Sequence, residues 1–416
     1  MSVANRLSIN FDRLKSNINA ISQIGRSQDH GIYRQAFTEN DLQARGWLSQ
    51  KMEEAGLHIE VDGAANIHGY LGDRSKPSVV VGSHIDSVPA AGPLDGTLGV
   101  LTGLECLQRI KEEGLELGYP LELVSFSDEE GRFGGLLGSQ SFVGDINPQR
   151  IYNSRDLNGV SLVDAMKACG YDAIQALDAR RNPRSVKSYL ELHIEQGPVL
   201  DSLDVPIGVV SHITGLFKWS IRLIGRPDHA GTTPMPMRAD ALAGLAEFSM
   251  EIPRVLEENG TERSVATIGK VDLFPGTANT VPGKVEFSLD CRDTDSKILQ
   301  DLMDAFRKAL SAIARRRDLM FEFDVLSEVD PVACDDSIQA IIRKASESVG
   351  CNHHSMPSGA AHDAQIVARI APVGMIFVPS KAGRSHSSAE WTDWEDIETG
   401  ANVALQSLLQ MAEARI

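Results

Sequence analysis

The sequence predicts two mixed α/β domains, one inserted into the other, and three observations support this prediction. The chain has 416 residues, which is too long for one compact core of the usual size. Apolar runs separated by helical patterns occur before Thr214 and again after Pro331, as in an α/β sheet with helices on its faces. Between them, alternating apolar and polar residues indicate antiparallel strands. We expect a discontinuous α/β domain over residues 1–212 and 331–416, and an inserted α+β domain over residues 213–330.

The discontinuous domain begins with a helical stretch and continues with strands. Ser8 to Gly56 is helical in pattern, and Asn40 is placed to cap a helix that ends near Gly56. Uninterrupted apolar runs are typical of buried parallel strands. The expected strands are His58–Val61, Ala65–Leu71, Ser78–Ser83, Leu121–Phe126, Ser188–Ile194 and Val373–Val378. The expected helices are Leu98–Lys111, Ser337–Val349, Ala364–Ala368 and Trp394–Ala414.

The inserted domain has a different pattern. Its expected strands are Phe217–Ile224, Ser264–Val271, Lys284–Arg292 and Met320–Leu326, and its expected helices are Asp240–Met250 and Ser296–Arg317. The resulting order, β-α-β-β-α-β, is that of a split βαβ layer of about a hundred residues.

Composition excludes several classes of partner. A formal net charge of −17 argues against nucleic acid, whose phosphates require a basic face. No stretch approaches the roughly 18 apolar residues of a membrane span, and Met1 to Phe11 contains no export signal. Five scattered cysteines are typical of free thiols in a reducing compartment. We expect a cytoplasmic protein with no nucleic-acid or membrane partner, in which local arginines and metal ions still allow an anionic ligand.

Polar residues follow four of the expected apolar strands. In α/β sheets, functional groups gather just past the carboxyl ends of strands. Each cluster alone fits a solvated loop or a hydrogen-bonded core histidine, but four such coincidences favour one shared site. The residues concerned are His84, Asp86 and Asp95 after the first of these strands, Glu129 and Glu130 after the second, His193 in the third and His386 after the fourth.

These residue types suit a metal site. The mixed nitrogen and oxygen ligands suit zinc or manganese, and one bridging carboxylate with two further ligands per ion would make a two-metal centre. His84 and Asp86 are two apart and share a face of an extended segment, where a carboxylate can hold the second ring nitrogen. Of the adjacent Glu129 and Glu130, one can bind metal and the other can act as a general base.

Eight motifs together resemble the M20 metallopeptidase clan, and specifically its amidase branch of N-carbamoyl-L-amino acid hydrolases, β-ureidopropionases and allantoate amidohydrolases. They are GSHIDSVPAAGPLDGTLGV, SDEEGRFGG, ELHIEQGPVL, DHAGTTPM, ANTVPG, DCRD, SGAAHDA and GRSHSSAEW, and they span nearly the whole chain. The resemblance implies a catalytic domain with a zinc-aminopeptidase-like mixed sheet. It also implies that the inserted domain is a ferredoxin-like lid through which the chain forms a homodimer.

The resemblance also implies a role for each candidate at the metal centre. One divalent ion would be held by His84, Asp95 and His193, and a second by Asp95, Glu130 and His386. Glu129 would be the general base, and Asp86 would orient His84. The position of His193 is usually a carboxylate in peptidase members, so this histidine favours the amidase branch.

For the substrate, the resemblance implies that His229 stabilises the oxyanion in the partner subunit's site and that Asn279 and Arg292 bind the substrate carboxylate. Gln196 and Gly359 are further candidates for substrate contact. From the residues alone, His229 also fits a surface turn and Arg292 a local ion pair. Ala361 stands where the family commonly has glycine, which bears on the shape of the acid-binding pocket.

We therefore expect a hydrolase with two divalent ions per subunit, zinc or manganese, or cobalt or nickel in their place. It would cleave the carbamoyl C–N bond of an N-carbamoyl-L-amino acid or a β-ureido acid and release amino acid, carbon dioxide and ammonia. The alternatives are an allantoate amidohydrolase, an aminoacylase or dipeptidase of the same clan, and a non-catalytic acid-binding member. His193 argues against the dipeptidase, and the intact ligand set with Glu129 argues against the non-catalytic member.

Overall fold

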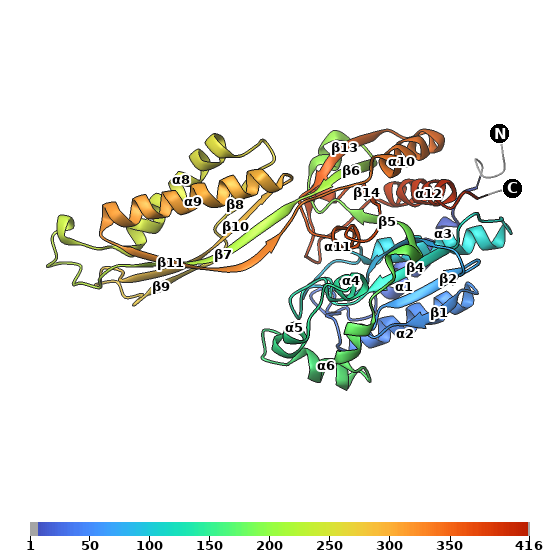
Figure 1. Cartoon of the computed structure of the whole chain (residues 1–416), viewed down its shortest axis with the longest axis horizontal. Helices are drawn as coiled ribbons and strands as arrows, with labels where there is room; N and C mark the ends of the chain where they lie inside the picture. The colour runs from blue at the N-terminus through green and yellow to red at the C-terminus, as the bar shows by residue number, and fades with distance from the viewer. Residues whose placement is uncertain (1–6, 415–416) are drawn as a thin grey trace. The chain divides into compact units, whose positions relative to one another are not determined.

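The computed structural model describes residues 7–414, which fold into two compact units (Figure 1). Unit 1 comprises the chain up to Ser211 and from Ala333 onward, and unit 2 comprises His212–Val332. The predicted fold class is confirmed: unit 1 is built on a mixed sheet, and unit 2 is an α+β insertion. Residues 1–6, which contain part of the segment in which no export signal is visible, lie outside the described residues.

Unit 1 is organised by a mixed sheet of nine strands in the order β1-β2-β4-β3-β5-β14-β6-β12, with β13 paired to β6. Neighbours within β4-β3-β5-β14 pair in parallel, whereas β2 pairs antiparallel with β4 and β6 antiparallel with β14. The strands are β1 His58–Val61, β2 Ile67–Leu71, β3 Ser78–His84, β4 Leu121–Phe126, β5 Val186–Ile194, β6 Ile207–Ile213, β12 Val332–Ala333, β13 His353–Ser358 and β14 Val373–Val378. Four neighbouring strands therefore end at the same edge.

Helices cover both faces of this sheet because alternate strand residues point to opposite sides. Val79, Leu192 and Ile376 face the main core, over which α3, α12, α10 and α1 pack. The other face contacts α4 and α11, where Phe142 packs edge-on against Phe126. The helices of unit 1 are α1 Phe11–Ile21, α2 Glu39–Glu54, α3 Thr97–Glu112, α4 Leu137–Val143, α5 Pro148–Asn153, α6 Leu162–Ala168, α7 Val199–Leu203, α10 Asp336–Val349, α11 Asp363–Val367 and α12 Trp394–Met411.

The first helical stretch differs from the expectation. It contains two helices, and α2 is capped by Thr38, whose side chain accepts the N–H of Asp41. Asn40 lies inside the first turn of the helix and donates its side-chain amide to the carbonyl of Tyr33 instead. Thr and Asn both favour the cap position, so local sequence alone does not separate them.

Unit 2 is a five-stranded antiparallel sheet, ordered β11-β7-β10-β8 with β9 also paired to β10, and covered by two helices. Alternate residues such as Trp219 and Phe287 are buried beneath α8 and α9. Its elements are β7 Gly215–Ile224, α8 Ala241–Asn259, β8 Val265–Thr267, β9 Val271–Phe274, β10 Lys284–Asp293, α9 Ser296–Arg317 and β11 Met320–Val329. The expected strand Ser264–Val271 is thus two short strands, and α8 continues past the expected end at Met250 and through Pro253, which buries Ile252 and Val255.

The structure bears on two expectations from composition, which concern membrane spans and cysteines. No helix within residues 7–414 is both long enough and apolar enough to cross a membrane. All five cysteines lie among the described residues, and each is a free thiol.

A buried charged cluster joins β2 to β4. The ring of His68 lies 3.2 Å from Asp62 and 2.9 Å from Glu122, and Arg181 pairs with both oxygens of Glu122. Burial lowers the pKa of His68, but the hydrogen bonds and charges of the two carboxylates outweigh burial and raise it to about 9.

We predict that this cluster makes stability fall at alkaline pH. Because the folded pKa of His68 exceeds the unfolded value near 6.5, its contribution is complete below about pH 6.5 and is lost as pH rises through about 9. The full contribution is on the order of 3 kcal/mol. His68→Gln should be less stable than wild type at pH 6, and the difference should shrink by pH 9.5, as measured by denaturant unfolding at fixed metal concentration. A difference that is independent of pH would contradict the prediction.

Candidate metal centre

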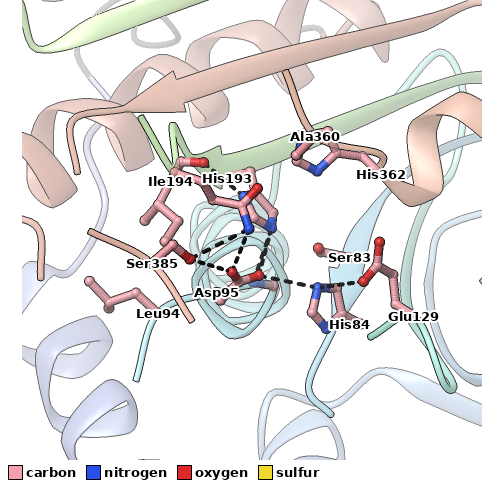
Figure 2. A network of polar contacts seen from close by, with 12 residues as sticks. Ser83, His84, Leu94, Asp95, Glu129, His193, Ile194, Ala360, His362 and Ser385 are labelled. Carbon is pink, nitrogen blue, oxygen red and sulfur yellow. Dashed lines mark hydrogen bonds and ion pairs between the residues drawn. The ribbon is translucent and has the colours of Figure 1, made fainter. Parts of the chain in front are cut away.

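The four parallel strands bring the predicted polar residues to one edge of the sheet. His84 ends β3, Glu129 and Glu130 follow β4, His193 lies near the end of β5, and His386 follows β14. Because β3 lies between β4 and β5, and β14 lies next to β5, these strand ends are neighbours in space. Figure 2 shows the side chains of His84 and His193 next to Asp95, with Glu129 on the far side of His84.

Asp95 is the residue that the others surround. Its Oδ1 atom lies 3.5 Å from Nε2 of His84 and 3.2 Å from Nε2 of His193. Its Oδ2 atom lies 3.5 Å from Nε2 of His386, which in turn lies 3.4 Å from Oε2 of Glu130. The two oxygens of one carboxylate therefore face two different groups of potential ligands, which is the arrangement that a bridging carboxylate requires.

Main-chain carbonyls fix the orientation of two of the imidazole rings. Nδ1 of His84 lies 3.0 Å from the carbonyl oxygen of Asp86, and Nδ1 of His193 lies 2.8 Å from that of Ile194. A ring that donates from Nδ1 carries no proton on Nε2, and Nε2 of His193 accepts the main-chain N–H of Gly96 at 3.1 Å. Both rings are almost completely buried, with exposed fractions of 2% and 1%. They are therefore held as preformed ligands.

Asp86 contacts the site in a different way from the one expected. Its carboxylate oxygen is 3.8 Å from Nδ1 of His84, which is too far for a hydrogen bond. The ring instead donates to the main-chain oxygen of Asp86. The carboxylate instead accepts the main-chain N–H groups of Glu129 and Glu130, at 3.4 and 3.3 Å. Asp86 thereby ties the end of β3 to the glutamate pair after β4.

The turn that contains Asp95 requires glycine at position 96. Gly96 has a φ of +60°, and a Cβ at this position would overlap the ring of His84. Two site residues with side chains, Gln196 and His386, also adopt left-handed backbone, with φ of +58° and +53°. Such conformations cost about 1–3 kcal/mol for residues other than glycine and often occur at functional sites.

Several buried carboxyl groups lie close together in the centre. Burial raises the pKa of Glu130 well above its usual value, and the charge of Asp95 adds to this shift. Burial likewise raises the pKa of Glu129, with further contributions from Asp363 and Glu130. In contrast, the neighbouring histidines outweigh burial and hold the pKa of Asp95 well below its usual range. Crowded buried carboxylates of this kind are stabilised by cations.

The residues fit divalent ions on two grounds. Ligand atoms of His84, Asp95 and His193 lie within 4.8 Å of one another, and so do those of Asp95, Glu130 and His386. In addition, Oε1 of Glu130 and Oε1 of Gln196 are buried without a hydrogen-bond partner. A buried oxygen without a partner is costly unless it binds an ion or water. The site therefore offers unused acceptors where ions would bind.

A third cluster, Glu191 with His193 and His362, has similar spacing. Its carboxylate is already occupied, because Glu191 accepts the hydroxyl of Ser83 at 2.7 Å and the N–H of Ala364 at 3.0 Å. His362 lies 2.8 Å from the hydroxyl of Ser358 and packs edge-on against His193. This cluster packs against the candidate ligand His193.

The loop that contains Gly359 and Ala361 passes beside this cluster, between β13 and α11. A Cβ at Gly359 would meet no other atom within 4 Å. The chain itself therefore does not require glycine at this position.

Gln196, expected as a substrate contact, lies at the metal cluster. Its side-chain amide donates to Oδ2 of Asp95 at 2.7 Å. Two further residues contact Asp95 and were not singled out from the sequence. The hydroxyl of Ser385 lies 2.8 Å from Oδ2 of Asp95, and the carboxylate of Glu390 accepts the main-chain N–H of Asp95. The sequence signal for both residues was their place in the motif GRSHSSAEW, in which Ser385 is next to His386 and Glu390 is four residues after it.

The remaining candidates lie in unit 2, at two separate places. His229 and Asn279 are neighbours, because the N–H of Ala230 donates to the carbonyl of Asn279 and a β-bridge joins His229 to Thr280. Both residues lie in loops beyond the end where Lys284 of β10 pairs with Ile224. Arg292 lies near the other end of β10, opposite Leu216, and pairs with Asp290.

Comparisons with known proteins agree with this geometry. The model of peptidase family M20/M25/M40 matches residues 80–410. The chain is 37% identical over 410 residues to the N-carbamoyl-L-amino acid amidohydrolase of Geobacillus stearothermophilus, covering 97% of this chain and 99% of the relative. It is 36% identical over 399 residues to the allantoate amidohydrolase of Escherichia coli K12, covering 94% and 96%. A hydantoinase/carbamoylase-family amidase from Burkholderia multivorans matches with a TM-score of 0.90 at 33% identity, covering 98% of this chain and 99% of that one.

The position of Asp95 between the two groups of possible ligands leads to a prediction about metal content. Asp95→Asn should lower zinc binding at both groups, because the amide offers one neutral oxygen where the carboxylate offers two charged ones. His386→Ala should weaken only one ion, because His386 faces only Oδ2 of Asp95. The measurement is zinc per chain by elemental analysis after equilibrium dialysis. Equal zinc content in Asp95→Asn and wild type would contradict the bridging arrangement.

Proposed function

This chain belongs to the M20/M25/M40 peptidase family and to its amidase/carbamoylase branch, and on that premise we propose that it hydrolyses the ureido C–N bond of an N-carbamoyl-L-amino acid or a β-ureido acid. Within this branch it is a hydrolase of carbon–nitrogen bonds other than peptide bonds. The observation that carries the proposal is the placement of Asp95 between two groups of ligands, with Glu129 beside them. The products would be an amino acid, carbon dioxide and ammonia.

The metal ligands are assigned as proposals on the geometry above. His84, Asp95 and His193 would hold one divalent ion, and Asp95, Glu130 and His386 the second. When bound, two such ions supply a Lewis acid for the ureido carbonyl and lower the pKa of water. The mixed nitrogen and oxygen ligands suit zinc or manganese, and cobalt or nickel would fit the same residues.

Glu129 is proposed as the general base. Its Oε2 atom lies 3.5 Å from Nε2 of His84, and its main-chain N–H is held by Asp86. From this position Oε2 would accept a proton from the attacking water and later return it to the leaving nitrogen. Its buried and crowded surroundings raise its pKa and thereby make the carboxylate a stronger base.

Unit 2 would supply the groups that hold the substrate. An arginine guanidinium recognises a carboxylate through two parallel hydrogen bonds, and an asparagine amide adds a third donor. Arg292 and Asn279 are proposed for this role, and His229 is proposed as the donor to the oxyanion.

The register of unit 2 supports a site shared between two chains, because it separates Arg292 from His229 and Asn279. Arg292 is eight residues along β10 from Lys284, whereas His229 and Asn279 lie beyond the Lys284 end. At about 3.4 Å per strand residue, the two places are roughly 27 Å apart. We therefore propose a homodimer in which each site takes Arg292 from one chain and His229 with Asn279 from the other.

An allantoate substrate is the second candidate. The allantoate amidohydrolase of Escherichia coli is nearly as similar to this chain as the carbamoyl hydrolase of Geobacillus stearothermophilus. Both substrate classes carry a carboxylate and a ureido group, so the residues named above serve either. We place the protein in the cytoplasm, in keeping with its free thiols.

Substrate assays test the proposed function directly. Zinc- or manganese-loaded protein should release ammonia from N-carbamoyl-L-amino acids or N-carbamoyl-β-alanine. Glu129→Gln should keep its metal while losing about 10²–10⁴-fold in kcat, because only proton transfer is removed. Release from allantoate alone would establish the second candidate. Formation of free amino acid from N-acetyl substrates alone would instead indicate an aminoacylase, and turnover of no substrate would contradict the proposal.

Mixed dimers test the shared site. Arg292→Ala and His229→Ala should each be nearly inactive alone. When both are co-expressed in equal amounts, half of the dimers are mixed, and each mixed dimer contains one complete site. Activity should therefore recover to about a quarter of wild type. If His229 and Arg292 acted within one chain, or if both came from the partner, every site would lack one of them and no activity would return.

A further inference from the structure

We propose that Glu390 is a positioning residue that holds Asp95 between the two metal groups, acting together with Ser385. This inference rests on the proposed function, because it concerns the metal ligands assigned there. Glu390 lies in the loop after β14, and Asp95 lies in the loop after β3, almost 300 residues earlier in the chain.

The contacts of Glu390 are directed at the backbone of the Asp95 turn. Its Oε1 atom accepts the N–H of Leu94 at 2.9 Å and the N–H of Asp95 at 3.1 Å. The side chain is buried, with 2% of its surface exposed. A buried carboxylate that accepts two successive N–H groups fixes the direction of that peptide segment, and thereby the direction in which Asp95 leaves the backbone.

Ser385 connects Glu390 to the carboxylate of Asp95. Its hydroxyl lies 3.1 Å from Oε2 of Glu390 and 2.8 Å from Oδ2 of Asp95, and Figure 2 shows it beside Asp95. Oδ2 is the oxygen that faces His386. Glu390 and Ser385 therefore control both the backbone and the side chain of the residue shared by the two metal groups.

Gly92 makes room for this arrangement. A Cβ at position 92 would overlap the Cβ, the carboxyl carbon and Oε1 of Glu390. The loop after β3 thus has no side chain at the point where Glu390 approaches it. Gly92, Ser385 and Glu390 come from two loops that are far apart in the sequence. In the folded chain they fit together around Asp95.

The hydrogen-bond pattern indicates which substitution should be tolerated. Glutamine at position 390 keeps a carbonyl oxygen for the N–H groups of Leu94 and Asp95. Its amide nitrogen would donate to the hydroxyl oxygen of Ser385, which leaves the hydroxyl proton of Ser385 for Asp95. Leucine has a similar volume but accepts no hydrogen bond, so it would release the Asp95 turn and leave two buried N–H groups without partners.

The test is zinc affinity, measured on the full-length protein by competition with a chromogenic chelator. We expect Glu390→Leu to weaken zinc binding by about 10–100-fold, the usual effect of removing a residue that orients a metal ligand. Glu390→Gln should bind zinc much more tightly than Glu390→Leu, because it keeps the acceptor for the two main-chain N–H groups. At saturating zinc, Glu390→Leu should also lower kcat while KM changes little, because the substrate-binding groups are untouched.

Glu105 provides a matched control. It is a buried glutamate in unit 1, 1% exposed, that accepts the N–H of Asn10 at 2.7 Å and pairs with Arg13. Glu105→Leu should lower the unfolding temperature without changing zinc affinity. If Glu390→Leu does not fold, Ser385→Ala carries the test, because it removes only the hydroxyl beside Asp95 and should also weaken zinc binding.

Two results would overturn the proposal. One is unchanged zinc affinity in folded Glu390→Leu or in Ser385→Ala. The other is equal loss in Glu390→Gln and Glu390→Leu, which would mean that the negative charge matters and not the accepted hydrogen bonds. Failure of the proposed function would be distinct from either result, because wild-type protein would then bind zinc without releasing ammonia from carbamoyl substrates, and the comparison of zinc affinities among the variants would be unaffected.

Discussion

The placement of one carboxylate, that of Asp95, is the constraint on which the rest of unit 1 depends. Its two oxygens face different ligand groups, so its position must be correct relative to four separate strand ends at once. A parallel arrangement of β4, β3, β5 and β14 meets this requirement, because it places all four carboxyl ends at one edge. The apolar cores on both faces of the sheet hold those strands in register, and the helices complete the cores.

The centre is preformed and strongly polar. Main-chain oxygens orient His84 and His193, and the carboxylate of Asp86 binds the backbone of the glutamate pair. Burial and mutual repulsion raise the pKa values of Glu129 and Glu130, and divalent ions bound at this centre would offset that repulsion. Cations bound there would also allow a chain of net charge −17 to take an anionic substrate at this site.

Much of this was predictable from the sequence because the signals are local. Each metal-ligand candidate follows or ends an apolar strand, and period-two alternation identified the sheet of unit 2. The choice of Thr38 over Asn40 as a helix cap was not predictable, because both residues suit that position. The contact of Glu390 with Asp95 was also not predictable, because it joins two loops that only the folded sheet brings together. The same holds for Asp86, where the path of the chain decides whether its carboxylate or its carbonyl meets the ring of His84.

The central claim is that Asp95 bridges two ions, and an anomalous-scattering diffraction map of zinc-loaded crystals tests it most directly. If Asp95 bridges two ions, the map should contain two peaks roughly 3.5–4 Å apart, one within ligand distance of each oxygen of Asp95. One peak should lie beside His84 and His193, and the other beside Glu130 and His386. A single peak, or two peaks of which only one contacts Asp95, would contradict the bridging role of Asp95.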